Sequence, residues 1–397
     1  MDTMAAADGL TPRPVLALNS GSSSFKFGLY QVQTTLAHAV TVEKLLSDSL
    51  DSIDEGNAQP SIAAFFERIF DHISDRIAKA GLPSPEAIGH RVVHGGPALH
   101  QHGVLDAAML RQIEDAAPFA PLHTARALAA IRAAQQHFSG LPQVACFDTV
   151  FHASMPDVAR VLPIPVAWQQ AGIRRYGFHG LSCESILQQL GDDLPARVIV
   201  AHLGHGASIT AIHRGQSVDT SMGLTPTGGV IMGTRSGDLD PGVLVYLVRI
   251  QKLDGEMLEN LLDHQSGLLG ISGISSDMRR LHAAAPTNPR ASLAIQMFCA
   301  SVAKQIAAMV TVLDGVDLLV FTGGIGENDA HVRLEICRGL SWIGVGLDEP
   351  CNQSAGQRIA IGLSAAIHSP ASRCTVRVMA SQEDVQIARH TWALTGR

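Results

Sequence analysis

Residues 19–24 gather small polar side chains in one short segment, N-S-G-S-S-S. Side chains this small let backbone N–H groups and hydroxyls converge on one point, and such a concavity suits an anion, above all a phosphate. An ordinary polar hairpin would use the same residues, so this segment alone leaves both interpretations open.

A later segment repeats the pattern. Residues 15–30 and 198–212 each read as an apolar run, a turn of small residues and an apolar alternation. Aligning the two apolar runs places Gly21 on Gly204. Two strand–turn–strand units favour a duplicated domain with a phosphate-binding turn in each half, and a ligand in the cleft between the halves.

Charged residues near glycine-rich segments indicate what could happen to a bound phosphate. Arg91 leads into a glycine turn, and Arg235 lies in the glycine-rich loop 221–242. A structural loop is one interpretation of 221–242, but loops this long in compact domains usually carry function. The planar fork of arginine matches phosphate or carboxylate oxygens, and Asp148 and Glu383 could hold Mg²⁺. Phosphoryl transfer needs little beyond positioning and charge neutralisation, so these residues fit that chemistry.

Each of these residues also has a structural interpretation. A loop arginine is often a surface ion pair, an aspartate a helix cap, and a histidine a satisfied core residue. His202 and His205 have no third ligand at a suitable spacing, which argues against a metal site there. Motifs of P-loop nucleotidases, zinc proteases, serine hydrolases and Rossmann dehydrogenases are absent from the sequence.

The elements that must position these residues follow from apolar patterns. The patterns predict strands at 15–18, 25–30, 88–96, 144–152 and 316–321, and helices at 61–80, 107–137 (broken at two prolines) and 293–313. The segment 322–328 is predicted to be a glycine turn at the carboxyl end of a strand, where open α/β sheets bind nucleotides.

Composition limits the class of protein. A length of 397 residues predicts two or three domains, and 46% apolar with 16% charged residues indicates a globular chain. A net charge of −7 argues against a nucleic-acid partner, and six cysteines without a C-x-x-C pair fit a cytosol. The first 14 residues do not resemble a signal peptide, and polar residues interrupt 293–313, so we expect a soluble cytoplasmic protein without a membrane partner.

Several motifs, in one order along nearly the whole chain, resemble the acetate/propionate kinase family. These motifs are residues 19–24, 90–96, 147–149, 175–180, 232–238 and 322–328. The resemblance implies an α/β fold of two related actin-like (ribonuclease H-like) domains from a duplication, with the active-site cleft between them. The predicted division is a flexible tail at 1–14, a first domain at 15–165 plus 381–397, and a nucleotide-binding domain at 166–380.

The resemblance also implies a reaction. It is the reversible, Mg²⁺-dependent transfer of the ATP γ-phosphate to acetate, giving acetyl phosphate and ADP by direct in-line transfer, usually in a homodimer; Mn²⁺ is an alternative metal. A carboxylic acid ionises near pH ~4.3, so the acceptor is already an anion at neutral pH and needs no general base. We therefore expect Asp148 to organise the site rather than to accept a proton.

Matching motif positions carries the family's site residues onto this chain. The implied catalytic residues are Arg91, Asp148, His179 and Arg235. The implied acyl-pocket and substrate residues are Val93, Leu122, His123, Phe178 and Pro226. The implied nucleotide residues are Ser22, Ser24, His202, Gly204, His205, Gly206, Asp277, Met278, Arg279, Gly324, Ile325, Gly326 and Asn328. Asn19 and Glu383 match the metal-side positions.

Some positions depart from the family's usual residues, and none of them is a residue assigned to catalysis. The departures are His205 for asparagine, Leu181 and Cys183 for threonine and histidine, Gly228 for an acidic residue, Thr124-Ala125 for Asn-Pro, and Gln382 for asparagine. We expect them to affect nucleotide preference and turnover.

Two other functions stay open at this point. Propionate kinase differs by one substrate methylene, worth about 0.8 kcal/mol of burial, and pockets discriminate such pairs by only roughly 10–200-fold. A non-catalytic nucleotide-binding module is the alternative of a different class; the presence of both arginines, Asp148, His179 and Glu383 argues against it.

Overall fold

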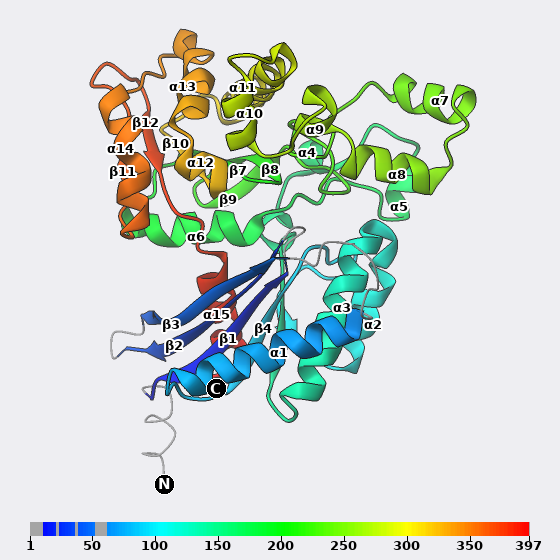
Figure 1. Cartoon of the computed structure of the whole chain (residues 1–397), viewed down its shortest axis with the longest axis vertical. Coiled ribbons are helices and arrows are strands. Elements are labelled where there is room, and N and C mark those ends of the chain that lie inside the picture. Colours follow the sequence, from blue (N-terminus) through cyan, green and yellow to red (C-terminus); the bar gives the residue numbers. More distant parts are fainter. Residues whose placement is uncertain (1–10, 21–23, 36–38, 52–61, 397) are drawn as a thin grey trace. The chain divides into compact units, whose positions relative to one another are not determined.

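The computed structural model describes residues 11–20, 24–35, 39–51 and 62–396 (Figure 1). Its contacts divide the chain into two compact units: Met1–Val150 with Gln382–Arg397, and Phe151–Ser381. We call these the first unit and the second unit. The first crossing in this division follows Val150, whereas the sequence suggests Pro165; the predicted domain boundaries stay a prediction.

The first unit is built on a six-stranded sheet of order β3-β2-β1-β4-β6-β5. β1 pairs with β2, β2 with β3, and β5 with β6 in antiparallel fashion, while β1–β4 and β4–β6 are parallel. The strands are β1 (Arg13–Ser20), β2 (Ser24–Thr34), β3 (Val40–Asp51), β4 (Ala87–Val92), β5 (Gly103–Val104) and β6 (Gln143–Phe147).

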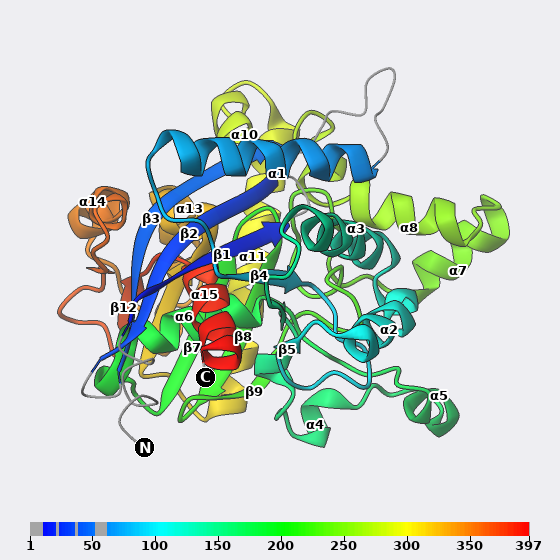
Figure 2. The same cartoon turned by 90° about the horizontal axis from the view of Figure 1, so that it is seen from below.

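Helices cover both faces of this sheet. α1 lies on one side of the strands and the C-terminal helix α15 on the other (Figure 2). Alternation along the strands explains the division: Leu16, Leu18 and Phe27 pack with Phe66 and Phe70 of α1. The helices of this unit are α1 (Ile62–Lys79), α2 (Ala107–Asp115), η2 (Ala117–Phe119), α3 (Pro121–His137) and α15 (Glu383–Thr395). The chain's last helix therefore returns to the first unit, as the resemblance implies.

The second unit repeats the first sheet. Its order is β11-β12-β10-β7-β8-β9, with antiparallel β7–β8, β8–β9 and β11–β12 pairs and parallel β7–β10 and β10–β12 pairs. The strands are β7 (Arg197–Leu203), β8 (Ala207–His213), β9 (Gln216–Thr220), β10 (Leu318–Thr322), β11 (Ala365–Ala366) and β12 (Thr375–Val378). Read from β9 to β11, the second sheet has the same strand order and the same parallel and antiparallel pairs as the first sheet read from β3 to β5. This match confirms the predicted duplication.

The second unit carries the other helices. They are α4 (Asp157–Arg160), α5 (Val166–Gln170), α6 (Gly180–Leu190), η4 (Gly191–Asp193), α7 (Pro241–Ile250), α8 (Gly255–His264), α9 (Gly267–Ser272), α10 (Met278–Ala284), α11 (Pro289–Leu313), α12 (Gly323–Asn328), α13 (Ala330–Arg338), η5 (Ser341–Ile343) and α14 (Glu349–Ala360); η3 (Val150–His152) spans the crossing. α6 packs Cys183 and Ile186 against Val200 and Val320 of the sheet.

Two helices test expectations from the sequence patterns. Among the described residues, α11 alone is long and apolar enough to cross a membrane, but Phe298, Val302 and Ile306 on one of its sides are buried within the unit, as in a core helix. Residues 323–328 form the short helix α12 rather than an open glycine turn. The helix can begin directly after β10 because Gly323 adopts a φ of 78° and its N–H is capped by the Glu327 carboxylate.

Candidate active site

Three polar side chains lie where parallel strands of the first unit end. Asn19 is near the end of β1, Arg91 near the end of β4, and Asp148 directly after β6. The parallel register pairs Leu18 with His90 and Arg91 with Cys146, so the three strand ends are level. The carboxyl ends of parallel strands form one edge of the sheet, and this edge is where open α/β sheets bind ligands.

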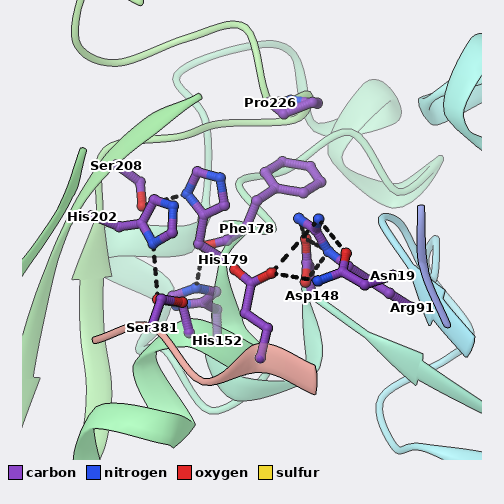
Figure 3. Close-up of polar contacts among 12 residues, drawn as sticks. Asn19, Arg91, Asp148, His152, Phe178, His179, His202, Ser208, Pro226 and Ser381 are labelled. Carbon is purple, nitrogen blue, oxygen red and sulfur yellow. Dashed lines mark hydrogen bonds and ion pairs between the residues drawn. The ribbon is translucent and has the colours of Figure 1, made fainter. Parts of the chain in front are cut away.

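The Arg91 guanidinium is the centre of this cluster (Figure 3). Its Nε donates to both carboxylate oxygens of Asp148, at 3.1 and 3.0 Å, and its Nη2 donates to Oδ2 at 2.6 Å. Its Nη1 donates to the Asn19 Oδ1 at 3.1 Å and lies 3.8 Å from the Glu383 carboxylate. The Asp148 side chain is only 1% exposed. This fork-to-carboxylate pairing fixes the plane of the guanidinium.

Electrostatics keep Arg91 cationic. Burial by itself lowers the pKa of the Arg91 guanidinium, but the negative charges of Asp148, Glu383 and Asp384 outweigh it and hold the pKa above its ordinary value. Arg91 therefore stays a positive charge with a fixed orientation among these carboxylates.

Two adjacent carboxylates begin α15 in the same cluster. The Asn19 Nδ2 donates to the Glu383 Oε2 at 3.0 Å and to the Asp384 Oδ1 at 2.8 Å. Burial raises the pKa of Asp384, Asn19 opposes that rise, and Glu383 adds to it. Carboxylate and amide oxygens are the ligands that Mg²⁺ prefers, so the donor set formed by Glu383, Asp384 and Asn19 fits this cation.

The turn between β7 and β8 brings together residues of the second unit. The Gly204 N–H donates to the Gly206 carbonyl at 2.9 Å, which closes the turn. A Cβ on Gly206 would lie 3.2 Å from the Arg235 Nη1 and 3.3 Å from the His179 Nε2. The glycine therefore leaves room for a guanidinium and an imidazole to approach the same point of the backbone.

The His179 ring is held by its neighbours in the second unit. Its Nδ1 is 2.9 Å from the Ser208 Oγ, and its ring stacks on His202 with centroids 4.1 Å apart (Figure 3). The His202 Nδ1 in turn lies 2.8 Å from the Ser182 Oγ, which accepts a 3.0 Å hydrogen bond from Ser381. The His179 Nε2 lies on the side of Gly206, and it carries the ring proton in the tautomer in which Ser208 donates to Nδ1.

Arg235 and His205 complete this region. Arg235 is buried and donates from Nη1 to the Pro226 carbonyl at 3.2 Å. His205 remains accessible at the turn, with its ring beside Gly233, where an added Cβ would lie 3.0 Å from Nδ1. Partial desolvation and the Arg235 and His264 charges lower the pKa of His205. His205 would therefore be mostly neutral at pH 7.

α12 forms a second glycine-rich feature at the end of β10. Gly324 is exposed, and a Cβ there would meet nothing within 4 Å, so a ligand could approach its backbone. The Glu327 carboxylate accepts the N–H groups of Gly323 and Ser381, both at 2.9 Å. The buried Arg333 donates to the Gly326 and Glu327 carbonyls at 2.9 and 3.0 Å. The helix is thus held at both ends.

Other predicted nucleotide residues occupy structural positions. Asp277 caps α10 by accepting the Arg279 N–H, and its carboxylate pairs with the exposed Arg279 guanidinium at 2.6 Å. Met278 is buried in the core. Ile325 is half-buried, and the exposed Asn328 donates to the Gly324 carbonyl at 2.9 Å.

The predicted acyl-pocket residues are divided between the units. Val93 and His123 are half-buried in the first unit, while Phe178 and Pro226 are buried in the second. Three predicted site residues lie wholly or partly outside the described residues: Ser22 entirely, and Ser24 and Leu122 in their side chains. The pocket and the first phosphate turn stay predictions.

Two departures from the family pattern have physical explanations. A Cβ on Gly228 would lie 3.2 Å from the Asp238 Oδ1, so an acidic side chain there would meet a like charge. Cys183 is fully buried in the apolar contact between α6 and the sheet, where a small side chain fits.

The structure adds residues that the sequence analysis did not select. They are His152, Ser182, Ser208, Glu327, Arg333, Ser381 and Asp384. Asp384 carried a signal, because two adjacent acidic residues at a helix start suit the positive end of the helix dipole. His152, Ser182, Ser208 and Ser381 are ordinary residue types whose partners lie 20 or more residues away. Glu327 and Arg333 contact α12 locally, and their residue types alone do not mark them as site residues.

Known proteins match this chain over nearly its full length. The model of the acetokinase family matches residues 14–389. An acetate kinase from Brachyspira hyodysenteriae is 38% identical over 96% of this chain and 99% of that protein. The crystal structures of a Francisella tularensis propionate kinase and a Porphyromonas gingivalis acetate kinase are 36% and 33% identical, with TM-scores of 0.81 and 0.79, and cover 96% of this chain and 100% and 99% of theirs. The chain belongs to the acetokinase family.

Proposed function

We propose that this chain catalyses the reversible transfer of the ATP γ-phosphate to acetate, giving acetyl phosphate and ADP. The observation that carries the proposal is the Arg91 cluster in a chain of this family. A guanidinium fixed by Asp148 and Asn19 suits the pairing of two anions, which is the central difficulty of this reaction.

The reaction needs no proton transfer. A carboxylate oxygen of acetate attacks the γ-phosphorus, the new O–P bond forms, and the bond from phosphorus to the β–γ bridging oxygen breaks to release ADP. Arg91 and Arg235 neutralise the approaching and transferring oxygens. His179 donates from Nε2 to the transferring group, and Asp148 orients Arg91.

The metal of the reaction is proposed to be Mg²⁺, with Mn²⁺ as an alternative. Glu383 and Asn19 would hold it, directly or through water, with Asp384 beside them. When bound, the cation supplies neutralising charge to the phosphate oxygens.

The nucleotide contacts are proposed from the glycine turns of the second unit. Backbone groups of Gly204, Gly206 and Gly324 would approach the phosphates, with His202 and His205 at the same turn. Ile325, Gly326, Asn328, Asp277, Met278 and Arg279 would contribute on the adenosine side, Met278 by supporting the fold of α10. Ser22 and Ser24 would contribute hydroxyls, and Val93, Leu122, His123, Phe178 and Pro226 would surround the acetate.

We further propose a cytoplasmic homodimer, cytoplasmic because ATP is its co-substrate. The exposed apolar residues of α7 support the assembly: Val245, Tyr246 and Ile250 are 52%, 54% and 59% exposed in the single chain. A helix with this much exposed apolar surface is typical of an interaction site. Sedimentation of the wild type against Ile250→Asp tests this, with a monomeric wild type contradicting it.

Propionate is the alternative acceptor, because a propionate kinase is among the similar structures. Trapping the acyl phosphate with hydroxylamine tests acetate, propionate and butyrate in parallel, each with ATP and GTP. Acetate giving the highest kcat/KM supports the proposal, and propionate leading would change the substrate while keeping the mechanism. No acyl phosphate from any acid, with ATP still bound, would overturn the proposal in favour of a binding module.

A further inference from the structure

His152 is a buried histidine that the proposed chemistry does not use. Its side chain lies in the second unit, where Nε2 is 3.0 Å from the Phe178 carbonyl (Figure 3). Its Nδ1 is 2.8 Å from the Ser217 Oγ. A carbonyl oxygen only accepts, so Nε2 must carry the proton and Nδ1 must accept from Ser217. Burial lowers the pKa of His152 to about 4, which keeps the ring in this neutral form at pH 7.

The carbonyl that His152 contacts belongs to the peptide joining Phe178 to His179. His179 adopts φ 58° and ψ 28°, in the left-handed region. Non-glycine residues rarely adopt this region, because Cβ crowds the backbone. The other such residues within the described ranges, Arg214, Lys252 and Asp314, are exposed, whereas His179 is buried.

Gly177, two residues before His179, also lies close to the His152 ring. Gly177 has φ 76°, and a Cβ there would lie 2.8 Å from the His152 Cγ and Cδ2. The backbone therefore approaches the imidazole at two points: Gly177 lies close to the Cγ and Cδ2 atoms, and the Phe178 carbonyl is hydrogen-bonded to Nε2. Rotation of the 178–179 peptide would break that hydrogen bond and turn the His179 ring away from Gly206.

We infer that His152 is a positioning residue: its hydrogen bond to the Phe178 carbonyl keeps His179 in the left-handed conformation that directs Nε2 toward Gly206 and Arg235. The inference rests on the proposed role of His179 in phosphoryl transfer. It differs from the ordinary explanation of a buried, satisfied histidine, because it predicts an effect on the chemical step beyond the effect on stability.

Two substitutions of His152 test the inference, because they place a side-chain N–H donor at different distances from the backbone. The amide of Gln reaches about as far as Nε2, whereas that of Asn reaches about as far as Nδ1. His152→Asn should lower kcat by roughly 10- to 100-fold, since a misplacement of about 1 Å can cost about 10²-fold. His152→Gln should recover most of that loss. KM for ATP should stay near the wild-type value in both variants.

Tyr176→Phe is the matched control. It removes a buried 2.8 Å hydrogen bond to a carbonyl, that of Gly172, without touching the Phe178 peptide. It should lower the melting temperature but leave kcat near the wild-type value. Equal kcat losses in Tyr176→Phe and His152→Asn would mean that His152 is only structural, and would overturn the inference.

A double-mutant cycle with His179 gives the sharper result. If His152 acts through His179, His152→Asn should slow the His179→Ala variant no further, because the group it positions is gone. If the loss of kcat in the double variant equals the product of the losses in the two single variants, the inference would be overturned.

A measurement without catalysis separates this inference from the proposed function. In ¹H–¹³C spectra of histidine-labelled protein, the His179 ring signal should move in His152→Asn and stay in place in Tyr176→Phe. An unmoved signal would overturn the inference even with an active wild type. A wild type that makes no acyl phosphate would contradict the proposed function but leave this result to decide the positioning.

Discussion

The two sheets of this chain have the same strand order but opposite chemistry at their strand ends. Matching Val15 with Val198 through the parallel registers aligns the strand-end residues Asn19, Arg91 and Asp148 with His202, Thr322 and Ser381. The first set is an ion-paired cluster, and the second is a set of hydroxyls and an imidazole beside glycine turns.

This difference indicates how a duplicated scaffold acquires two roles. The strands only provide an edge where side chains from distant segments meet, and the residues placed there decide what the edge can bind. We propose that charge at the first edge handles the anion that reacts, while glycine and backbone groups at the second handle the nucleotide.

The largest expected effect comes from removing charge at the first edge. Arg91→Ala should lower kcat by roughly 10²- to 10³-fold, the loss typical of removing a group that stabilises transition-state charge. It should also lower the free energy of unfolding by about 3–5 kcal/mol, because Asp148 stays buried after its partner is lost. ATP binding should largely survive. Acyl-phosphate assays measure kcat, urea unfolding measures stability, and calorimetry measures the affinity for ATP.

Two companion variants separate activity from stability. Arg235→Ala should lose turnover on the same scale with a smaller loss of stability, because Arg235 donates to a neutral carbonyl. The double variant Arg91→Met with Asp148→Leu should regain stability but not turnover. Near-normal turnover in either single arginine variant would contradict the charge-neutralising role proposed for that arginine.

A smaller effect is expected from alanine substitutions at equivalent positions of the two sheets. The same register aligns Gly89 of β4 with Val320 of β10. A Cβ on Gly89 would lie 2.2 Å from the Thr391 Oγ1 and 2.5 Å from the Ile387 Cγ2 of α15, whereas Val320 packs in the core beneath α6. Gly89→Ala should lower the free energy of unfolding by about 1–3 kcal/mol through overpacking.

The activity of Gly89→Ala tests whether α15 contributes to metal binding. Because α15 begins with Glu383, displacing the helix should raise the Mg²⁺ concentration needed for half-maximal activity. The matched control is Val320→Ala, which leaves a cavity in the second unit and should lower stability without changing the Mg²⁺ requirement. Equal Mg²⁺ concentrations for half-maximal activity in both variants would contradict the proposed role of α15 in metal binding.

The smallest expected effect is a change in pH dependence. Burial raises the pKa of Asp384 in the folded state above its value in the unfolded chain. The folded state therefore holds this proton more tightly, and stability falls as pH rises from the ordinary aspartate value through the raised one. Asp384→Asn cannot ionise and should lack this fall, while its Oδ1 can still accept from Asn19. Urea unfolding of both proteins between pH 4 and pH 7 gives the comparison; parallel curves would contradict it.

Sequence patterns predicted the fold well because they are local. The apolar run at 15–18 and the one that opens the segment 198–212 correspond to β1 and β7, and the repeat between the two segments predicted the duplication. The helix pattern at 293–313 likewise predicted most of α11. α12 was not predicted, because its start depends on the Glu327 cap and on the conformation of Gly323.

The site was less accessible to sequence reasoning. Family motifs pointed to Arg91, Asp148 and His179, and also to Asn19 and His202, which contact Arg91 and His179. They did not point to His152, Ser208 or Asp384. His152 supports His179 through a backbone carbonyl, and a carbonyl contact leaves no mark on residue type. Asp384 meets Asn19 only because the last helix returns to the first sheet, across a separation of 365 residues.

The most direct test of the central claim follows the oxygen atoms of acetate. Wild-type protein is incubated with ATP, Mg²⁺ and [¹⁸O₂]acetate, and the products are observed by ³¹P NMR. Direct attack on the γ-phosphorus predicts ADP together with acetyl phosphate whose phosphorus signal carries the isotope shift of one bonded ¹⁸O. AMP and pyrophosphate, or acetyl phosphate without that shift, would contradict the proposed transfer.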